Sequence, residues 1–393
     1  MPPEVRIAFH APMKPPDHPV PSGDRRMARA LMALLRDLGH EVVLASRFRS
    51  FEGRGDTAAQ QAIARAGAAE AQRLCAAYRR GERPRPDLWF TYHLYHKAPD
   101  HLGPELAETL GIPYLVAEAS VAGKQRNGPW AAGFEAALEA LRRADLVLAM
   151  TARDEAGLRH ALGPEAPIRR LRPFLDTAPF AAMSVRKRAL KRALAERLGL
   201  HPDHPFGLVV AMMREDVKRR SYHFLIEALS RIEEPLDMVV AGDGPARAEI
   251  ARRFADLSLE TRLIGGVCPA ALPELYGACD LFLWPGFGEA YGMAYLEAQA
   301  AGLPVVALNT AGVAEVVVEG KSGILVREER PEAFAAAIHE LLDADSRRRR
   351  AETAMQHVRA NHGLAPARET LAAALEEAIA NHRHREEHRP CAS

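Results

Sequence analysis

The sequence predicts an α/β protein with two doubly wound, Rossmann-like domains that face each other across a cleft. Apolar runs of about four to eight residues alternate with helical stretches, which indicates parallel sheets with crossover helices. The alternation occurs twice, before and after a polar stretch at 173–205 that carries several Arg and Pro residues. A chain of 393 residues with 48% hydrophobic residues can fill more than one core.

The first series of elements predicts a domain over 1–175. It opens with an apolar strand at 5–9 (VRIAF), followed by a helix at 25–38 that ends at Gly39. A second strand is expected at 41–46 (EVVLAS). Further buried strands are expected around Trp89, Leu115 and Leu148.

The second series predicts a domain over 205–364. It begins with GLVVAM at 207–212 and continues through the runs LDMVVAG, TRLIGG, LFLWP and PVVAL. Ligands of such sheets bind beyond the carboxyl ends of the strands. The loops that follow four of these strands, at Arg214, 242–244, 265–266 and Glu289, are therefore expected to converge on one site.

Composition excludes several classes of protein. A net charge of +1 argues against a general binder of nucleic acid or membrane surface, although it leaves peripheral membrane contact open. The four cysteines have no metal-ligand spacing, which favours reduced thiols and a cytoplasmic location. The N-terminus has no signal-peptide pattern, and no apolar stretch approaches the roughly 18 residues of a membrane span.

The loop and helix at 285–306 (PGFGEAYGMAYLEAQAAGLPVV) hold the most specific pattern. A loop broken by glycines carries Glu289 and leads into a helix that holds Glu297. Flexible backbone and a helix N-terminus favour an anion, here a phosphate at Gly292, Met293 and Ala294. Carboxylates accept hydrogen bonds from sugar hydroxyls, so the pattern predicts a nucleotide-sugar site. A surface loop with a capping acid is the alternative.

This run, E-x7-E followed by AGLPVVA, AGVAEVVVEG and SGILV, resembles the donor half of GT-B glycosyltransferases. It is most similar to retaining family 4, the glycogen-synthase-like enzymes also known as glycosyl transferases group 1. The resemblance is strong over about 208–329 and weak in the first half. It implies a metal-independent, hexosyltransferase-type enzyme with a UDP- or GDP-sugar as co-substrate and no other cofactor. It also implies that a helix at about 365–385 packs back on the first, acceptor-side domain.

The resemblance implies roles for particular residues of the second domain. Arg214 and Lys218 would hold the donor diphosphate and stabilise the leaving group, although a solvated basic helix start is the alternative. Glu289 would orient the donor sugar and Glu297 the ribose diol. Backbone contacts to the nucleotide would come from Gly242, Gly244, Gly266 and Val267.

The first domain matches the family less closely. Ser22 and Gly23 resemble the loop that approaches the diphosphate, whereas Ser22 or Asp24 can equally be a helix N-cap. Glu118 stands where family members often carry a histidine that faces the sugar. His93 and His96 are candidate substitutes on the acceptor side. Two histidines at this spacing can also bind a metal or serve only packing.

Three further patterns carry no site. The segment 320–323 (GKSG) lacks the first glycine of a P-loop, and Asp343-Ala344-Asp345 is expected at an exposed helix end. The tail from His382 to His388 is expected to be solvated. No metal site is predicted.

The mechanism expected from the resemblance is transfer on the same face through an oxocarbenium-like state. The departing phosphate would accept the proton of the acceptor, because no nucleophilic carboxylate is evident. Two alternatives stay open: an epimerase or hydrolase on the same fold, and a non-catalytic nucleotide-sugar-binding protein. The acceptor is a saccharide, a lipid-linked saccharide or a small metabolite, with no role for nucleic acid.

Overall fold

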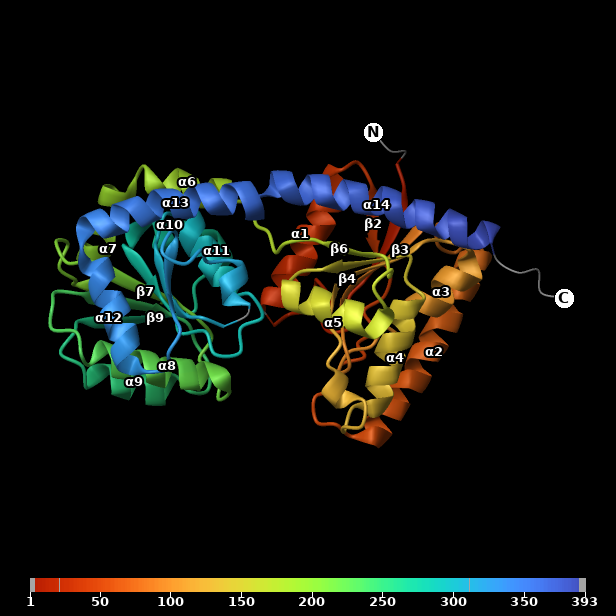
Figure 1. Cartoon of the computed structure of the whole chain (residues 1–393), viewed down its shortest axis with the longest axis horizontal. Helices are drawn as coiled ribbons and strands as arrows, with labels where there is room; N and C mark the ends of the chain where they lie inside the picture. Colours follow the sequence, from red (N-terminus) through yellow and green to blue (C-terminus); the bar gives the residue numbers. More distant parts are fainter. Residues whose placement is uncertain (1–3, 21, 311, 389–393) are drawn as a thin grey trace. The chain divides into compact units, whose positions relative to one another are not determined.

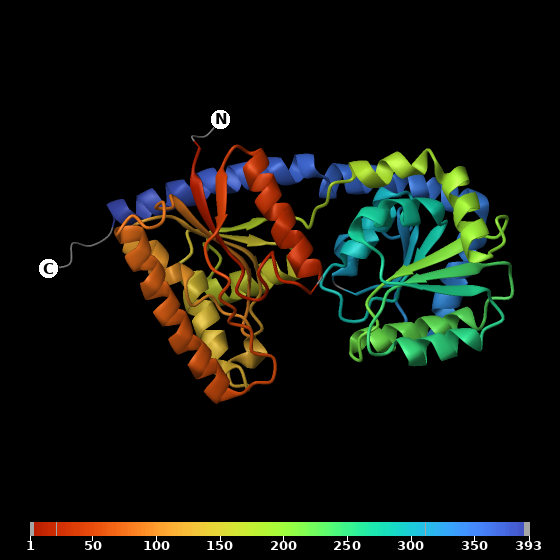
Figure 2. The ribbon, with the colours of Figure 1, turned by 180° about the vertical axis from the view of Figure 1, so that it is seen from behind.

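The computed structural model describes residues 4–20, 22–310 and 312–388, so Pro21, Ala311 and Cys391 lie outside the described residues. The chain divides into unit 1, Met1–Pro173 with Ala365–Ser393, and unit 2, Phe174–Leu364. Each unit contains one six-stranded parallel sheet covered by helices (Figure 1, Figure 2). The predicted class of two Rossmann-like domains is therefore confirmed.

Unit 1 has the strand order β2-β1-β3-β4-β5-β6. Its strands are β1 Arg6–His10, β2 Glu41–Leu44, β3 Leu88–Leu94, β4 Tyr114–Ala119, β5 Leu146–Ala149 and β6 Ile168–Arg170. Its helices are α1 Gly23–Asp37, α2 Thr57–Arg79, α3 Gly103–Leu110, the 3₁₀ turn η1 Gly123–Gln125, α4 Ala131–Arg142, α5 Ala152–Leu162 and α14 Leu364–Glu387. The first five strands lie where the apolar runs indicated, whereas β6 was not predicted. Its partial burial explains this, because IRR carries no run of apolar residues.

Unit 2 has the strand order β12-β11-β10-β7-β8-β9. Its strands are β7 Phe206–Val210, β8 Asp237–Ala241, β9 Thr261–Gly265, β10 Leu281–Leu283, β11 Val305–Leu308 and β12 Gly323–Val326. Its helices are α6 Ala178–Ser184, α7 Lys187–Leu198, α8 Val217–Leu229, α9 Arg247–Ala255, α10 Leu272–Ala278, α11 Met293–Ala300, α12 Pro331–Leu342 and α13 Ala344–His362, with 3₁₀ turns η2 Pro269–Ala271 and η3 Val313–Glu315. Helices α8, α9 and α12 pack together on one face of the sheet, and α6, α7, α10, α11 and α13 cover the other (Figure 1).

The last helix, α14, is fastened to unit 1 by a buried carboxylate. Asp145, whose side chain is 1% exposed, accepts from the backbone N–H of Tyr114 at 2.8 Å. It also pairs with Arg385 at 3.0 Å and with His382 at 3.3 Å. The expectation of a solvated tail from His382 onward is thus wrong for His382, which is buried. Sequence periodicity did not show this, because the partner lies more than two hundred residues away.

None of the helices in the described residues is both long and apolar enough to cross a bilayer. The most extensive apolar burial lies instead in the strands. All four residues of β5 and of β11 are buried. Such continuous apolar strands are typical of parallel sheets that helices cover on both faces.

Candidate functional site

The sheet of unit 2 reverses its direction of growth between two neighbouring strands. From β7 the chain proceeds outward to β8 and β9, and from β10 it proceeds the other way to β11 and β12. The loops after β7 and β10 therefore diverge at the carboxyl edge, which is where ligands of doubly wound sheets bind. Arg214 and Lys218 follow β7 in the chain, and Glu289 follows β10.

Lys218 and Glu289 meet at this point. The Lys218 ammonium forms an ion pair with Glu289 Oε1, and the two side chains are 16% and 17% exposed. Glu289 Oε1 also accepts from the indole N–H of Trp284 at 3.0 Å. The Lys218 ammonium lies 5.5 Å from the Trp284 ring centroid, within range of a cation–π attraction. These contacts hold the cation and the carboxylate in place at the edge of the sheet.

Arg214 lies close to Lys218 in the chain but is more exposed. Its Nε is 3.0 Å from Asp216 Oδ2, and half of its side chain is accessible. Asp216 also caps α8, because its Oδ1 accepts from the Lys218 backbone N–H at 2.9 Å. Asp216 therefore contacts both the Arg214 side chain and the Lys218 backbone.

The helix that follows Glu289 begins at Met293, as the glycine pattern predicted. Gly292 is its N-cap with φ of 73°, a conformation that residues with a side chain rarely adopt. No side chain caps this end, so backbone N–H groups of the first turn are directed out of the helix. The half-buried backbone at Gly292, Met293 and Ala294 therefore suits an anion.

Glu297 is placed differently from the other predicted donor residues. It lies in the second turn of α11 and is only 1% exposed. Its Oε2 accepts from the Tyr276 hydroxyl at 3.0 Å. In this conformation the Tyr276 contact occupies a carboxylate oxygen that we assigned to a ribose diol. That assignment stays a prediction.

The remaining predicted donor residues of unit 2 belong to loops that backbone hydrogen bonds join to the β7 loop. Met213, next to Arg214, donates to Asp243 O at 2.9 Å, and Gly242 donates to Gly265 O at 2.8 Å. These bonds join the loops at the carboxyl ends of β7, β8 and β9, and the last two loops carry Gly242, Gly244, Gly266 and Val267.

In unit 1 the predicted acceptor-side residues His93 and Glu118 form a cluster with Asp24. His93 Nδ1 lies 3.1 Å from Asp24 Oδ1 and 3.8 Å from Glu118 Oε1. His93 lies in β3 and Glu118 in the neighbouring strand β4. Both residues have positive φ, at 63° and 56°. Among the described residues they are the two non-glycine positions with this strained backbone, which is typical of functional sites. One side-chain atom each of His93, Glu118 and Asp24, which is in the first turn of α1, lie within 4.8 Å of one another.

The charges of this cluster determine the protonation of His93. Burial by itself lowers the pKa of His93, but Glu118 and Asp24 outweigh it and raise this pKa to about 9. Burial raises the pKa of Glu118 despite the attraction of His93, and it likewise raises the pKa of Asp154 in the first turn of α5. His93 is thus an imidazolium at neutral pH, flanked by carboxylates from α1, β4 and α5.

We expect the neutral Glu118→Gln variant to lower the pKa of His93, since it removes one of the three carboxylate charges that raise it. The measurement is an NMR titration of the His93 ring. Because its pKa is raised from 6.5 to about 9, the stabilisation that His93 contributes is present below about pH 6.5 and is lost as pH rises through about 9. Glu82→Gln, an exposed carboxylate of the same unit, is the control. An unchanged titration in Glu118→Gln would contradict the assignment.

The other predicted residues of unit 1 do not join this cluster. Ser22 is the N-cap of α1, since its hydroxyl accepts from the Arg25 backbone N–H at 3.2 Å, and Gly23 starts the helix with open space at its Cα. His96 instead packs edge-on against Trp130, at 5.8 Å between ring centroids. It lines a small cavity of about 120 Å³ together with Gln60, Lys97 and His101. The two histidines therefore lie in different surroundings, and the groups suited to a metal do not include both.

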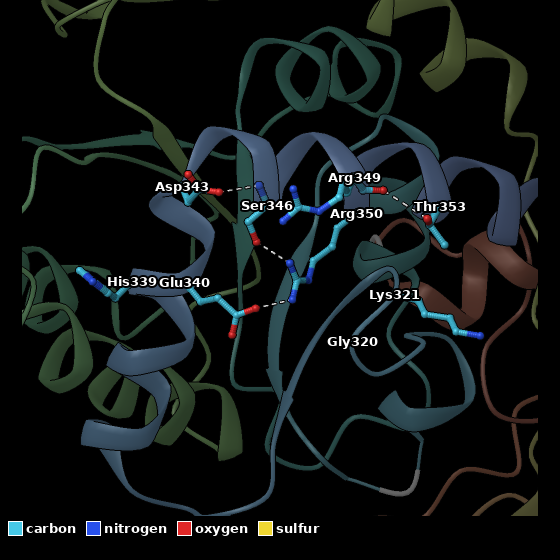
Figure 3. A pocket seen from close by; sticks show the side chains of 9 residues that line it. All are labelled: Gly320, Lys321, His339, Glu340, Asp343, Ser346, Arg349, Arg350 and Thr353. Atoms are coloured by element: carbon cyan, nitrogen blue, oxygen red, sulfur yellow. Dashed lines mark hydrogen bonds and ion pairs between the residues drawn. The ribbon is translucent and has the colours of Figure 1, made fainter.

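A hollow larger than the cavity beside His96 contains none of the predicted site residues. It has a volume of about 620 Å³ and lies between α12, α13 and the turn at Lys321 (Figure 3). Several of its polar groups already have partners within the protein. Arg350 forms hydrogen bonds with Ser346 and Glu340, whereas Asp343 caps α13 (Figure 3). Asp343 and Asp345 are exposed, and Asp343 caps α13, as expected for an exposed helix end.

Comparison with known proteins identifies the family of unit 2. Residues 205–344 match the family described as Glycosyl transferases group 1. Unit 2 is a group 1 glycosyl transferase domain. The predicted resemblance is confirmed by this match, and the Lys218–Glu289 pair and the start of α11 belong to that glycosyl transferase domain.

Curated proteins with similar sequences are also named glycosyltransferases. The chain is 32% identical over 225 residues to the GDP-mannose-dependent alpha-(1-6)-phosphatidylinositol monomannoside mannosyltransferase of Mycolicibacterium smegmatis, covering 53% of this chain and 56% of that protein. It is 29% identical over 283 residues to D-inositol 3-phosphate glycosyltransferase 2 of Catenulispora acidiphila, covering 67% and 64%. The chain thus spans between half and two thirds of the length of these relatives.

Solved structures extend the likeness to both units. The Anabaena protein Alr3699/HepE in complex with UDP has a TM-score of 0.74 at 16% identity, covering 95% of this chain and all of that one. The glycosyltransferase WaaG, involved in lipopolysaccharide biosynthesis, has a TM-score of 0.66 at 17% identity, covering 93% and 98%. At this level of identity the likeness shows the fold, and the expected GT-B fold is confirmed.

The sequence did not predict the contacts that three residues make at these sites. Trp284 had been assigned only to an apolar strand, yet its indole N–H holds Glu289. Asp24 had been considered as an N-cap, yet it pairs with His93. Asp154 was not singled out, although its position in the first turn after a strand is the sequence signal that could have found it.

Proposed function

We propose that this protein is a retaining glycosyltransferase that moves a sugar from a nucleoside-diphosphate sugar to an acceptor without a metal ion. Unit 2 binds the donor, and unit 1, with α14, supplies the acceptor side. The observation that supports this most is the Lys218–Glu289 pair, which lies at the strand-order reversal of a group 1 glycosyl transferase domain.

The pair suits departure of a diphosphate. As the glycosidic bond breaks, negative charge grows on the bridging oxygen of the leaving group, and a fixed cation there stabilises the transition state. Lys218 is such a cation, because Glu289 and the Trp284 ring restrict its position. Arg214, half exposed and paired only with Asp216 in the contacts above, provides the second charge by turning to the phosphates.

The carboxylates supply the recognition of hydroxyls. Glu289 has one oxygen engaged by Trp284 and Lys218, and binding of a sugar would exchange part of the Lys218 contact for hydroxyl donors. In unit 1 the His93 imidazolium and Glu118 offer a donor and an acceptor for a polar substrate. We keep Glu297 as the ribose contact, which requires the carboxylate to rotate away from Tyr276.

GDP-mannose and UDP-sugars are the first donors to test. The mycolicibacterial relative is named for GDP-mannose, and the Anabaena structure contains UDP. Inositol phosphates, phosphatidylinositol mannosides and simple sugars are the matching first acceptors, since the relatives are named for the first two kinds.

The test combines thermal unfolding with product analysis. A nucleotide that binds the folded protein at 100 times its Kd should stabilise it by about 2.7 kcal/mol. Incubation of the stabilising donor with the acceptor panel should yield a glycoside with the donor's anomeric configuration, in the presence of EDTA. Free monosaccharide from the donor alone would favour a hydrolase. Stabilisation with no product from any acceptor would favour a binding protein, and an inverted product would refute retention.

A further inference from the structure

A second polar cluster of unit 2 lies at the amino-terminal edge of its sheet. The loop HPDH at 201–204 joins α7 to β7 and carries two histidines three residues apart. Asp237 is the first residue of β8, in register with Phe206 at the start of β7. The cluster is therefore at the opposite end of these strands from Arg214 and the Gly242 loop.

The three side chains converge closely. His204 Nδ1 lies 2.9 Å from Asp237 Oδ1, and His201 Nδ1 lies 3.5 Å from Oδ2 of the same carboxylate. The two imidazole rings are 4.5 Å apart between centroids and tilted by 32°. Each residue can offer one ligand atom such that all three atoms lie within 4.8 Å of one another. Zn²⁺ with bonds of about 2.0–2.1 Å in tetrahedral geometry holds its ligand atoms about 3.3 Å apart, close to the observed spacings.

The Asp237 carboxylate is buried and held in place, as expected of a metal ligand. Asp237 is 2% exposed at its side chain, and the His201 backbone N–H donates to its Oδ2 at 2.7 Å. A bond of this kind orients a ligating carboxylate from outside the coordination shell. A purely structural role, in which Asp237 holds the loop to the sheet, explains the bond from the His201 backbone and the His204 contact. It does not explain the position of the His201 imidazole, because its 3.5 Å distance exceeds the usual hydrogen-bond distance of about 2.7–3.2 Å.

We propose that His201, His204 and Asp237 bind a divalent transition-metal ion, with zinc as the ion that this ligand set fits best. Two imidazoles and one carboxylate suit zinc, whereas Mg²⁺ and Ca²⁺ require oxygen ligands. The fourth position is open to water, because His201 and His204 are 61% and 33% exposed at their side chains. The ion would join the α7–β7 loop to β8 and stabilise unit 2. It would not take part in sugar transfer.

Two other groups of the described residues offer similar ligand atoms and fit less well. Asp24, His93 and Glu118 contain one imidazole, and its pKa of about 9 means that a metal must displace a bound proton. His384, Glu387 and His388 are all exposed on or beside the last turn of one helix. The cluster at Asp237 alone of the three combines two imidazoles with a buried carboxylate.

The experiment uses the full chain without an affinity tag, freed of metal and titrated with ZnCl₂ against a chromophoric chelator. We expect one tight equivalent of Zn²⁺ and a higher unfolding temperature. His201→Ala/His204→Ala should weaken that equivalent by at least about 100-fold, since even outer-shell partners contribute about 10–100-fold. His384→Ala/His388→Ala and His93→Gln are matched controls that should keep it.

The single variant His201→Ala guards against loss of folding. This side chain is largely exposed, and its backbone N–H still bonds to Asp237. Without metal, His201→Ala should have the same unfolding temperature as the parent. With zinc, the variant should lack the rise in unfolding temperature that the parent shows. The proposal is overturned if the parent binds zinc no better than His201→Ala/His204→Ala, or if the tight equivalent disappears in either control. Activity of the donor site has no bearing on these outcomes.

Discussion

Replacing Lys218 with methionine should lower the rate of sugar transfer about 10²–10³-fold, the loss typical of removing one donor to a developing oxyanion. Methionine keeps much of the apolar stem but removes the charge that we propose faces the leaving diphosphate. The effect should fall mainly on kcat, because the cation contributes most when the bond breaks. Steady-state kinetics with the donor found in the binding screen measures it.

Lys321→Met is the matched control for this variant. Lys321 is an exposed lysine on the turn before β12, away from the carboxyl edge of the sheet (Figure 3). The Lys321→Met variant should transfer sugar at the parent rate. Lys218→Met also leaves Glu289 with the Trp284 hydrogen bond but without its counter-ion, so urea unfolding must show that the variant is folded. A folded Lys218→Met with parental kcat would refute the role of Lys218.

The second large effect is expected at the start of α11. Gly292→Ala should destabilise unit 2 by about 2–5 kcal/mol. Positive φ costs a residue with a side chain about 1–2 kcal/mol, and an added Cβ would lie 2.6 Å from two atoms of the Tyr295 ring, an overlap worth about 1–3 kcal/mol. Tyr295 is completely buried and cannot move aside easily. Nucleotide affinity should fall in parallel, since relief of the clash displaces the first-turn N–H groups.

Gly320→Ala separates backbone strain from the clash. Gly320 has φ of 69°, but an added Cβ there meets no atom within 4 Å. It should therefore cost only about 1–2 kcal/mol and leave nucleotide binding unchanged. Urea denaturation and a nucleotide titration of both variants make the comparison. Equal losses of stability and affinity in the two variants would contradict the expected importance of the α11 start.

Much of the fold could be predicted because its strands are continuous apolar runs. In β5 and β11 every residue is buried, so the sequence shows them directly. The helix start at Met293 was likewise visible, because glycines before it interrupt any earlier helix. Strand β6 was missed because IRR is only partly buried and has no apolar run.

The contacts between distant residues could not be predicted in the same way. Lys218 and Glu289 were chosen separately, for phosphate and for sugar, but the structure pairs them directly. His382 was expected to be solvated, but it is buried beside Asp145. The cluster of Asp24, His93 and Glu118 depends on two strained backbone positions, which no local pattern of residue types indicates.

We propose above all that a nucleoside diphosphate binds between the first turn of α11 and the cations at Arg214 and Lys218. The most direct measurement is a calorimetric titration of the parent and Lys218→Met with UDP and GDP. We expect heat of binding with at least one nucleotide and at least about a tenfold loss of affinity in the variant, equivalent to about 1.4 kcal/mol. Equal affinity in the two proteins, or no binding of either nucleotide to the parent, would contradict the account.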